Sequence, residues 1–184
     1  AMEDSSRDSQ RFQQQRFILS QLLVMALKGV PAFYLPALLA SNNDIKRFSI
    51  TGERRDLNRE KFEFEKLLID LNDINSNANK NLNFLRNAMK IRSELDSFHP
   101  ISEMECLTKD RPDVVAIRRG IGDNSIYALH NFTDKKLNYS IKNDKITSLT
   151  NERITFKDYL SEKEYFNLNF VLEPFQVLWI GISK

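Results

Sequence analysis

The chain has 184 residues, of which 41% are hydrophobic, and this is enough for one ordinary domain or two small ones with a buried core. Its 27 basic and 25 acidic residues give a formal net charge of +2 and are interleaved along the chain, which argues against a nucleic-acid surface as the main function. The single cysteine, Cys106, excludes an internal disulfide and favours a reducing compartment, so we expect a cytoplasmic protein.

The N-terminal third begins polar and becomes strongly apolar. Residues 1–10 show no apolar period, so we expect an expression tag or a segment without fixed structure. Over residues 11–27 the apolar positions form two adjacent helical stripes, which predicts a helix that buries most of its surface. Polar residues and two prolines interrupt the apolar run 17–40, so it is not expected to span a membrane. We expect this run to be covered by self-association or by a later helix at 77–95.

Residues 29–60 carry the side chains that bear on chemistry. Gly29 and Pro31 predict that the helix ends there and that a short strand follows over residues 32–35. The residues after this strand, 41–59, are polar and irregular, which predicts a loop that holds polar groups in place.

Two further helices are predicted before the pattern changes. Apolar residues at helical spacing indicate helices at 60–71 and 77–95, with an asparagine-rich break between them. Pro100 marks the boundary that we expect between a helical domain, residues 11–99, and an all-β domain, residues 100–184.

From residue 101 the apolar period shortens to two, which predicts an antiparallel β-sandwich. The predicted strands are 103–107, 114–118, 125–132, 137–141, 145–149, 165–172 and 175–182. Pro174 lies between the last two strands and cannot donate to a ladder, so we expect it at a bend or an edge.

Four stretches occur in an order and spacing typical of one enzyme family: Gly-Val-Pro-Ala-Phe-Tyr at 29–34, Asn43-Asp44, Gly52 with Leu57-Asn58-Arg59, and residues 172–179. Together they resemble the end of the catalytic domain and the closing strand of sucrose phosphorylases and their glucosylglycerate-cleaving relatives, in the alpha-amylase superfamily of glycoside hydrolases. The resemblance implies an α+β fold: the end of a (β/α)8 barrel, with helices and one strand, followed by an antiparallel β-sandwich.

The resemblance also implies a reaction. Such an enzyme transfers glucose reversibly from an α-glucoside to phosphate through a covalent glucosyl-enzyme, with retention of configuration. The family's catalytic carboxylates lie on earlier strands, which would fall upstream of Ala1, so we nominate no catalytic residue and expect this chain alone to be inactive. The acidic residues Asp44, Asp56 and Glu60 are more typical of a solvated loop.

The resemblance places Arg59 at the glucose subsite, where a guanidinium suits paired hydroxyls and a neighbouring carboxylate. The alternative for Arg59 is a salt bridge at a helix terminus. Asn58 and Asp44 are weaker candidates for substrate binding: Asn58 suits a helix cap, and Asp44 suits either a brace for Arg54 or Arg55 or a solvent-facing turn.

No metal or cofactor is expected. His99, His130 and Cys106 lack the spacing of metal ligands, and the chain has no phosphate-binding glycine loop or dinucleotide fingerprint. The position of His130 in an alternating strand favours a core histidine. Asn131 begins a glycosylation sequon of a kind that arises often by chance.

Two interpretations therefore stand. In the first, the chain is the C-terminal portion of an α-glucoside phosphorylase, with an α-glucoside and phosphate as partners of the full-length enzyme. In the second, it is a stand-alone, non-catalytic carbohydrate-binding or structural module, with Tyr127, Tyr139 or Trp179 as a sugar-binding platform. Neither interpretation involves a nucleic acid or a membrane.

Overall fold

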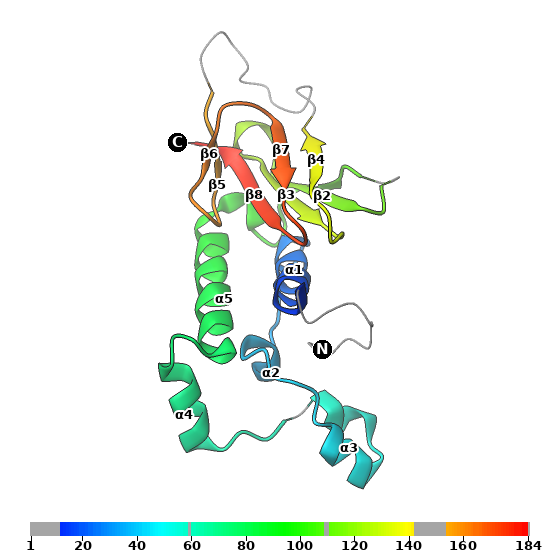
Figure 1. The fold of residues 1–184 in the computed structure, drawn as a ribbon. Helices are drawn as coiled ribbons and strands as arrows, with labels where there is room; N and C mark the ends of the chain where they lie inside the picture. The colour runs from blue at the N-terminus through cyan, green and yellow to red at the C-terminus, as the bar shows by residue number, and fades with distance from the viewer. Residues whose placement is uncertain (1–11, 59, 109–110, 142–153, 184) are drawn as a thin grey trace. The chain divides into compact units, whose positions relative to one another are not determined.

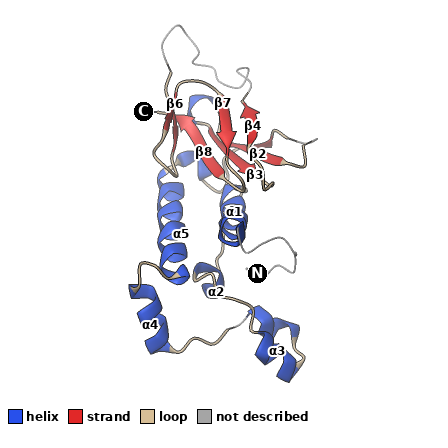
Figure 2. Cartoon of the chain, in the orientation of Figure 1, coloured by secondary structure: helices blue, strands red, loops and turns tan. Residues whose placement is uncertain are grey.

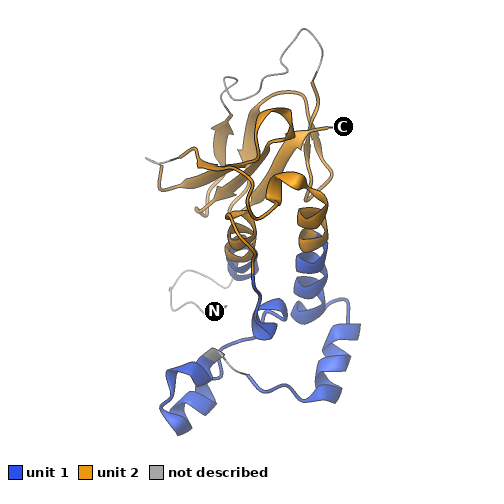
Figure 3. Ribbon diagram, turned by 180° about the vertical axis from the view of Figure 1, so that it is seen from behind, with its two compact units in different colours: residues 1–18, 32–87 blue, residues 19–31, 88–184 orange. Residues whose placement is uncertain are grey.

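The structure is a computed structural model that describes residues 12–58, 60–108, 111–141 and 154–183 (Figure 1). Helices come first along the chain and strands follow (Figure 2). The described residues form five α-helices: α1 (Gln13–Ala26), α2 (Leu35–Leu38), α3 (Ile45–Thr51), α4 (Phe64–Asn72) and α5 (Asn77–Glu94). The chain divides into two compact units (Figure 3). Unit 1 contains residues 1–18 and 32–87, and unit 2 contains residues 19–31 and 88–184.

Unit 2 contains two antiparallel sheets. The larger sheet has the order β1-β2-β3-β8-β5-β6, and the smaller one pairs β4 with β7. The strands of the larger sheet are β1 (Met104–Cys106), β2 (Val114–Arg119), β3 (Ile126–Asn131), β8 (Val177–Ile182), β5 (Phe156–Asp158) and β6 (Glu164–Tyr165). Those of the smaller sheet are β4 (Leu137–Ser140) and β7 (Asn169–Leu172). Every ladder between these described strands is antiparallel.

Alternating side chains build the main core of unit 2. Tyr127 and Leu129 of β3 and Leu178 of β8 belong to one buried cluster with Phe170 and Leu172 of β7, so the larger sheet packs on the smaller one. The predicted α+β class, with helices followed by an antiparallel sandwich, is confirmed for the described residues. The sheets do not close into a barrel.

The opposite face of the larger sheet is also buried. The fully buried Trp179 of β8 packs against Phe98 of a short 3-10 helix (Asp96–Phe98), with ring centroids 4.7 Å apart and ring planes inclined at 50°. Burial on both faces explains why every residue of β3 is buried. A strand that is covered on both sides reads as a continuous apolar run in sequence.

Unit 1 consists of helices and connecting segments. Phe17 and Ala40 form a buried apolar cluster with Ala37 packed against it, and Leu39 and Leu85 are also buried. Asn81 of α5 is fully buried and donates from Nδ2 to the carbonyls of Ala37 and Leu38, at 3.1 and 2.8 Å, so it satisfies the last turn of α2.

The single strand predicted for the helical part, at 32–35, is wrong. The chain is extended up to Tyr34 and then enters α2, whose first turn contains Pro36. A proline in the first helical turn has its ring torsion preset for a helix and lacks a donor that the turn does not need.

Several boundaries also differ from the predicted ones. The helix expected at 60–71 begins at Phe64, and α3 lies where an irregular loop was predicted. The strand expected at 165–172 is divided between β6 and β7, and β5 was not predicted. The strand expected at 145–149 and the N-terminal segment 1–10 lie outside the described residues. None of the described helices is both long enough and apolar enough to cross a bilayer.

Candidate functional site

The segment with the candidate sugar-binding residues forms a compact helical turn in unit 1. Asp44 precedes α3 and caps it, because its Oδ1 accepts a hydrogen bond from the backbone nitrogen of Arg47 at 2.9 Å. Gly52 ends α3 with a φ of 69°, in the left-handed region that favours glycine, and its nitrogen donates to the carbonyl of Phe48 at 2.8 Å. The chain then reverses into a 3-10 helix, Arg54–Asn58.

A backbone hydrogen bond closes this turn. The nitrogen of Asp44 donates to the carbonyl of Leu57 at 2.9 Å. Asn43-Asp44 and Leu57-Asn58, which are separate motifs in sequence, therefore lie side by side. The chain position that follows them is Arg59.

Asp56 is the carboxylate that holds the turn together. It is buried, and its Oδ2 lies 2.8 Å from the hydroxyl of Thr51 and 3.3 Å from Nε of Arg47. The hydrogen bond from Thr51 lowers the pKa of Asp56, as do the hydrogen bond and charge of Arg47. The Thr51 hydroxyl also accepts a bond from the nitrogen of Glu53 at 3.2 Å. The prediction that Asp56 lies in a solvated loop is wrong.

The three nominated residues have different outcomes. Asp44 acts as a helix cap, and no ion pair joins it to Arg54 or Arg55 within the part of the chain that the structure describes. Asn58 ends the 3-10 helix, and its backbone alone is described. Arg59 lies outside the described residues. The substrate-binding roles of all three remain predictions.

An open cavity of about 340 Å³ lies in unit 1. Its lining includes residues 39–42 and 60–63, which precede and follow this turn in sequence. Its walls come from the α2–α3 connection, the segment that follows Arg59, and the beginnings of α4 and α5. Ser41, Asn42, Lys61 and Asp70 are among its polar lining residues. The lining contains three carboxylates, Glu60, Glu63 and Asp70, and two lysines, Lys61 and Lys66, so hydrogen-bond donors and acceptors both face the cavity.

Among the described residues, no group of three or more His, Cys, Asp or Glu side chains is placed to hold a metal ion. His130 is fully buried on β3, with Nδ1 3.2 Å from the carbonyl of Val115. Burial lowers the pKa of His130 to about 4, so the ring is neutral at pH 7. His130 is therefore a core histidine, as its strand position predicted, and Cys106 is exposed.

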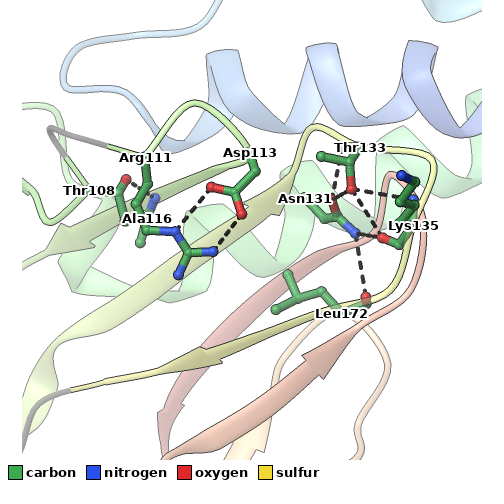
Figure 4. A network of polar contacts seen from close by, with 8 residues as sticks. All are labelled: Thr108, Arg111, Asp113, Ala116, Asn131, Thr133, Lys135 and Leu172. Atoms are coloured by element: carbon green, nitrogen blue, oxygen red, sulfur yellow. Dashed lines mark hydrogen bonds and ion pairs between the residues drawn. The ribbon is translucent and has the colours of Figure 1, made fainter.

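The sequon asparagine is also a core residue. Asn131 is fully buried, and its Nδ2 donates to the carbonyl of Lys135 at 2.7 Å and lies 3.4 Å from that of Leu172 (Figure 4). The same Nδ2 also donates to the carbonyl of Glu173 at 2.8 Å. Its Oδ1 accepts bonds from the nitrogen and the hydroxyl of Thr133 at 2.9 and 2.8 Å. The amide thus ties the β3–β4 turn to the residue after β7, and it is not accessible to a glycosylating enzyme in the folded chain.

Two of the three aromatic residues named as candidates for a sugar-binding platform lie in the core. Tyr127 and Trp179 are buried in the core of unit 2, and Tyr139 is half-buried. Aromatic residues on the strands therefore serve packing, and the sequence-based assignment of Tyr127 and Trp179 to sugar binding is wrong.

The fold of the described residues matches part of the alpha-amylase family of glycoside hydrolases. An alpha-amylase from Anoxybacillus superposes with a TM-score of 0.65 at 13% identity, over 94% of this chain and 33% of the amylase. The isomaltulose synthase of Erwinia rhapontici NX5 gives a TM-score of 0.66 at 13% identity, over 97% of this chain and 40% of the synthase.

Sequence comparison identifies a narrower group within that class. The glucosylglycerate phosphorylase of Escherichia coli K12 is 27% identical over 165 residues, which are 90% of this chain and 28% of the relative. That of Allomeiothermus silvanus is 28% identical over 165 residues, or 90% of this chain and 26% of the relative. The chain is a distant homologue of glucosylglycerate phosphorylases and spans about a quarter of their length. No protein-family model matches the chain.

Proposed function

We propose that the chain is the C-terminal part of a retaining α-glucoside phosphorylase that acts on glucosylglycerate or a similar α-glucoside, with phosphate as the acceptor. The observation that carries this proposal is the sequence similarity to glucosylglycerate phosphorylases over 90% of the chain. The chain supplies part of the sugar site and the all-β domain, and the nucleophile and acid/base carboxylates belong to other parts of the enzyme.

The geometry of the α3 turn supports a positioning role at the sugar site. The Asp44–Leu57 backbone bond and the Asp56–Arg47 ion pair fix the residues immediately before Arg59. A guanidinium that is held on a rigid turn keeps its planar donors aligned for two sugar hydroxyls, with less entropy lost on binding.

The surface of unit 1 supports the proposal that it belongs to a larger structure. Several large apolar side chains are exposed on α3 and α4 and just beyond them: Ile45, Ile50, Phe64, Leu68, Ile69 and Ile74. Exposed apolar groups in such number favour a covering partner. In the relatives, which are three to four times as long as the matched segment, the rest of the polypeptide is available to cover them.

A direct experiment tests the assignment of the catalytic carboxylates. The purified 184-residue chain is incubated with 2-O-α-glucosylglycerate and phosphate, and glucose 1-phosphate is measured with a coupled enzyme. We expect no release above the buffer control, because the nucleophile required by a retaining mechanism is missing. Release that scales with the concentration of the chain would place an active site among residues that are here called structural.

The role of Arg59 is tested in the complete phosphorylase that contains this segment. Arg59→Ala should lower kcat/KM about tenfold to a hundredfold, since a lost charge-assisted hydrogen bond is worth about 1.5–3 kcal/mol. Arg59→Lys should recover little because an ammonium lacks the planar fork. Arg54→Ala is the matched control, because Arg54 is an exposed arginine of the same turn and should leave the kinetics unchanged. Wild-type kinetics of Arg59→Ala with a lowered melting temperature would identify Arg59 as a structural brace.

A further inference from the structure

Two arginines that are distant in sequence converge on the last turn of α1 within unit 2. Arg92 of α5 donates from Nε to the carbonyl of Met25 and from Nη2 to the carbonyl of Gly29, both at 2.9 Å. Arg119 of β2 donates from Nη1 to the carbonyl of Ala26 at 3.1 Å.

Arg119 makes three further contacts to backbone. Its Nη1 also reaches the carbonyl of Leu27 at 2.7 Å, its Nη2 the carbonyl of His99 at 2.8 Å, and its Nε the carbonyl of Glu103 at 3.4 Å. The side chain has an exposed fraction of 0%, so its whole guanidinium is used inside the protein. A fully buried arginine is retained only where its donors are satisfied.

Neither guanidinium forms an ion pair with a carboxylate within the described ranges. The negative charge that they meet is the C-terminal end of α1, whose last carbonyls have no partner inside the helix. The last turn of α1 contains no basic residue of its own. Arg92 and Arg119 therefore provide, from elsewhere in unit 2, the positive charge that this helix end needs.

An aromatic residue joins the two arginines to the core. The Cζ atoms of Arg92 and Arg119 lie 5.8 and 5.7 Å from the ring centroid of Phe98, within the range of a cation–π contact. Phe98 in turn packs against Trp179 of the central strand β8. The helix end is thus connected to the buried core around Trp179 through the Phe98 ring.

We infer that Arg92 and Arg119 are positioning residues that clamp the turn at residues 25–29. The turn is followed directly by the Gly-Val-Pro-Ala-Phe-Tyr stretch, so the clamp fixes the point at which the chain leaves unit 2 for the segment with the candidate sugar-binding residues. The functional meaning of this clamp rests on the proposed function, but the clamp itself rests on the contacts above.

Trypsin provides a local test because Lys28 is exposed and lies inside the clamped turn. Cleavage after Lys28 requires the flanking backbone to open into an extended form, which the bonds to Met25 and Gly29 oppose. Arg92→Met removes these two hydrogen bonds. Because Arg92 lies on α5, the substitution leaves the charges on the strands unchanged. We expect the initial rate of cleavage after Lys28, followed by mass spectrometry, to rise about tenfold to a hundredfold.

Two further variants sharpen the test. Arg86→Met is the matched control, because Arg86 is an exposed arginine of the same helix and its loss removes one tryptic site in the same way. Arg92→Lys keeps the charge and loses the fork, so its rate of cleavage should be intermediate.

Global stability is measured in a separate experiment, urea unfolding followed by the fluorescence of Trp179, the single tryptophan of the chain. The inference is supported if cleavage after Lys28 accelerates in Arg92→Met while the Trp179 transition keeps its midpoint. It is overturned if the rate of cleavage stays at the wild-type value, or if it rises only in step with a loss of global stability. No sugar or phosphate is needed, so failure of the proposed function would leave this result unaffected.

Discussion

The two units are built from one polypeptide but differ in how completely they bury their apolar residues. In unit 2 nine buried residues form one cluster between two sheets, whereas the buried apolar residues among the described part of unit 1 are Phe17, Leu39, Ala40 and Leu85. Both units expose large apolar residues: those of unit 1 gather on the helices α3 and α4, whereas several of those in unit 2, such as Ile101, Ile121 and Phe166, lie in connections between elements. The difference teaches that unit 2 contains its own source of stability, and that the helices of unit 1 have surfaces suited to another partner.

The largest expected effect breaks the core of unit 2. Trp179 is fully buried and packs against Phe98, so Trp179→Ala should lower the free energy of unfolding by about 3–5 kcal/mol through lost burial and a cavity. The measurement is urea unfolding followed by far-ultraviolet circular dichroism, because the variant lacks the fluorescent reporter. Val171→Ala on β7 is the control, since Val171 is exposed and its truncation should cost less than about 0.5 kcal/mol. Equal losses for both variants would contradict the assignment of the core.

The second effect is pH-dependent and also belongs to unit 2. Burial lowers the pKa of His130 from 6.5 to about 4, so between these values the unfolded chain binds a proton that the folded chain does not. Stability from His130 is therefore present above pH 6.5 and is lost as the pH falls toward 4. At about 1.4 kcal/mol for each pKa unit, the loss approaches about 3 kcal/mol.

A variant isolates this histidine from other titrating groups. Burial raises the pKa of Asp158, and a raised carboxyl pKa makes stability fall as the pH rises, which opposes the effect of His130. The difference in unfolding free energy between wild type and His130→Gln at each pH removes the contribution of Asp158. The difference should shrink as the pH falls from 6.5 to 4, and a difference that is independent of pH would show that His130 does not titrate in this way.

Sequence patterns predicted the elements that local periodicity defines. α1 and α5 show the helical period over more than ten residues, and β2, β3 and β8 show strand-like apolar runs, so their positions were close to those observed. The short helix α3 was missed although it has both end signals, a cap at Asp44 and a glycine at Gly52. The apolar residues of α3 are largely exposed and form no apolar stripe, so the sequence pattern did not indicate a helix there.

The candidate site was predictable only in part. Resemblance pointed to Arg59, Asn58 and Asp44, but no local pattern indicated that Asp56 would bond to Thr51 across the turn at Gly52. The clamp on α1 was harder to predict from sequence, because Arg119 donates to the carbonyl of a residue 93 positions earlier in the chain. Contacts of that kind depend on the tertiary fold, and a single sequence with no relatives beside it contains no sign of them.

The smallest effect on stability is expected at the exposed face of α4, where it tests the other side of the comparison. Phe64 is 73% exposed and Leu68 43%, so changing both to glutamine should alter the free energy of unfolding by less than about 0.5 kcal/mol for each site. Glutamine is a good helix former and leaves α4 intact. If this face is covered by a second copy of the chain, the double variant should shift the sedimentation profile toward the monomer at concentrations where the wild type associates.

Glu65→Gln is the matched control for both measurements, because it changes an exposed residue of the same helix without removing apolar surface. A wild-type chain that sediments as a monomer at all concentrations would contradict self-association through α4. A large loss of stability in the double variant would instead show that the face is already buried within the chain, and unit 1 would then be as complete as unit 2.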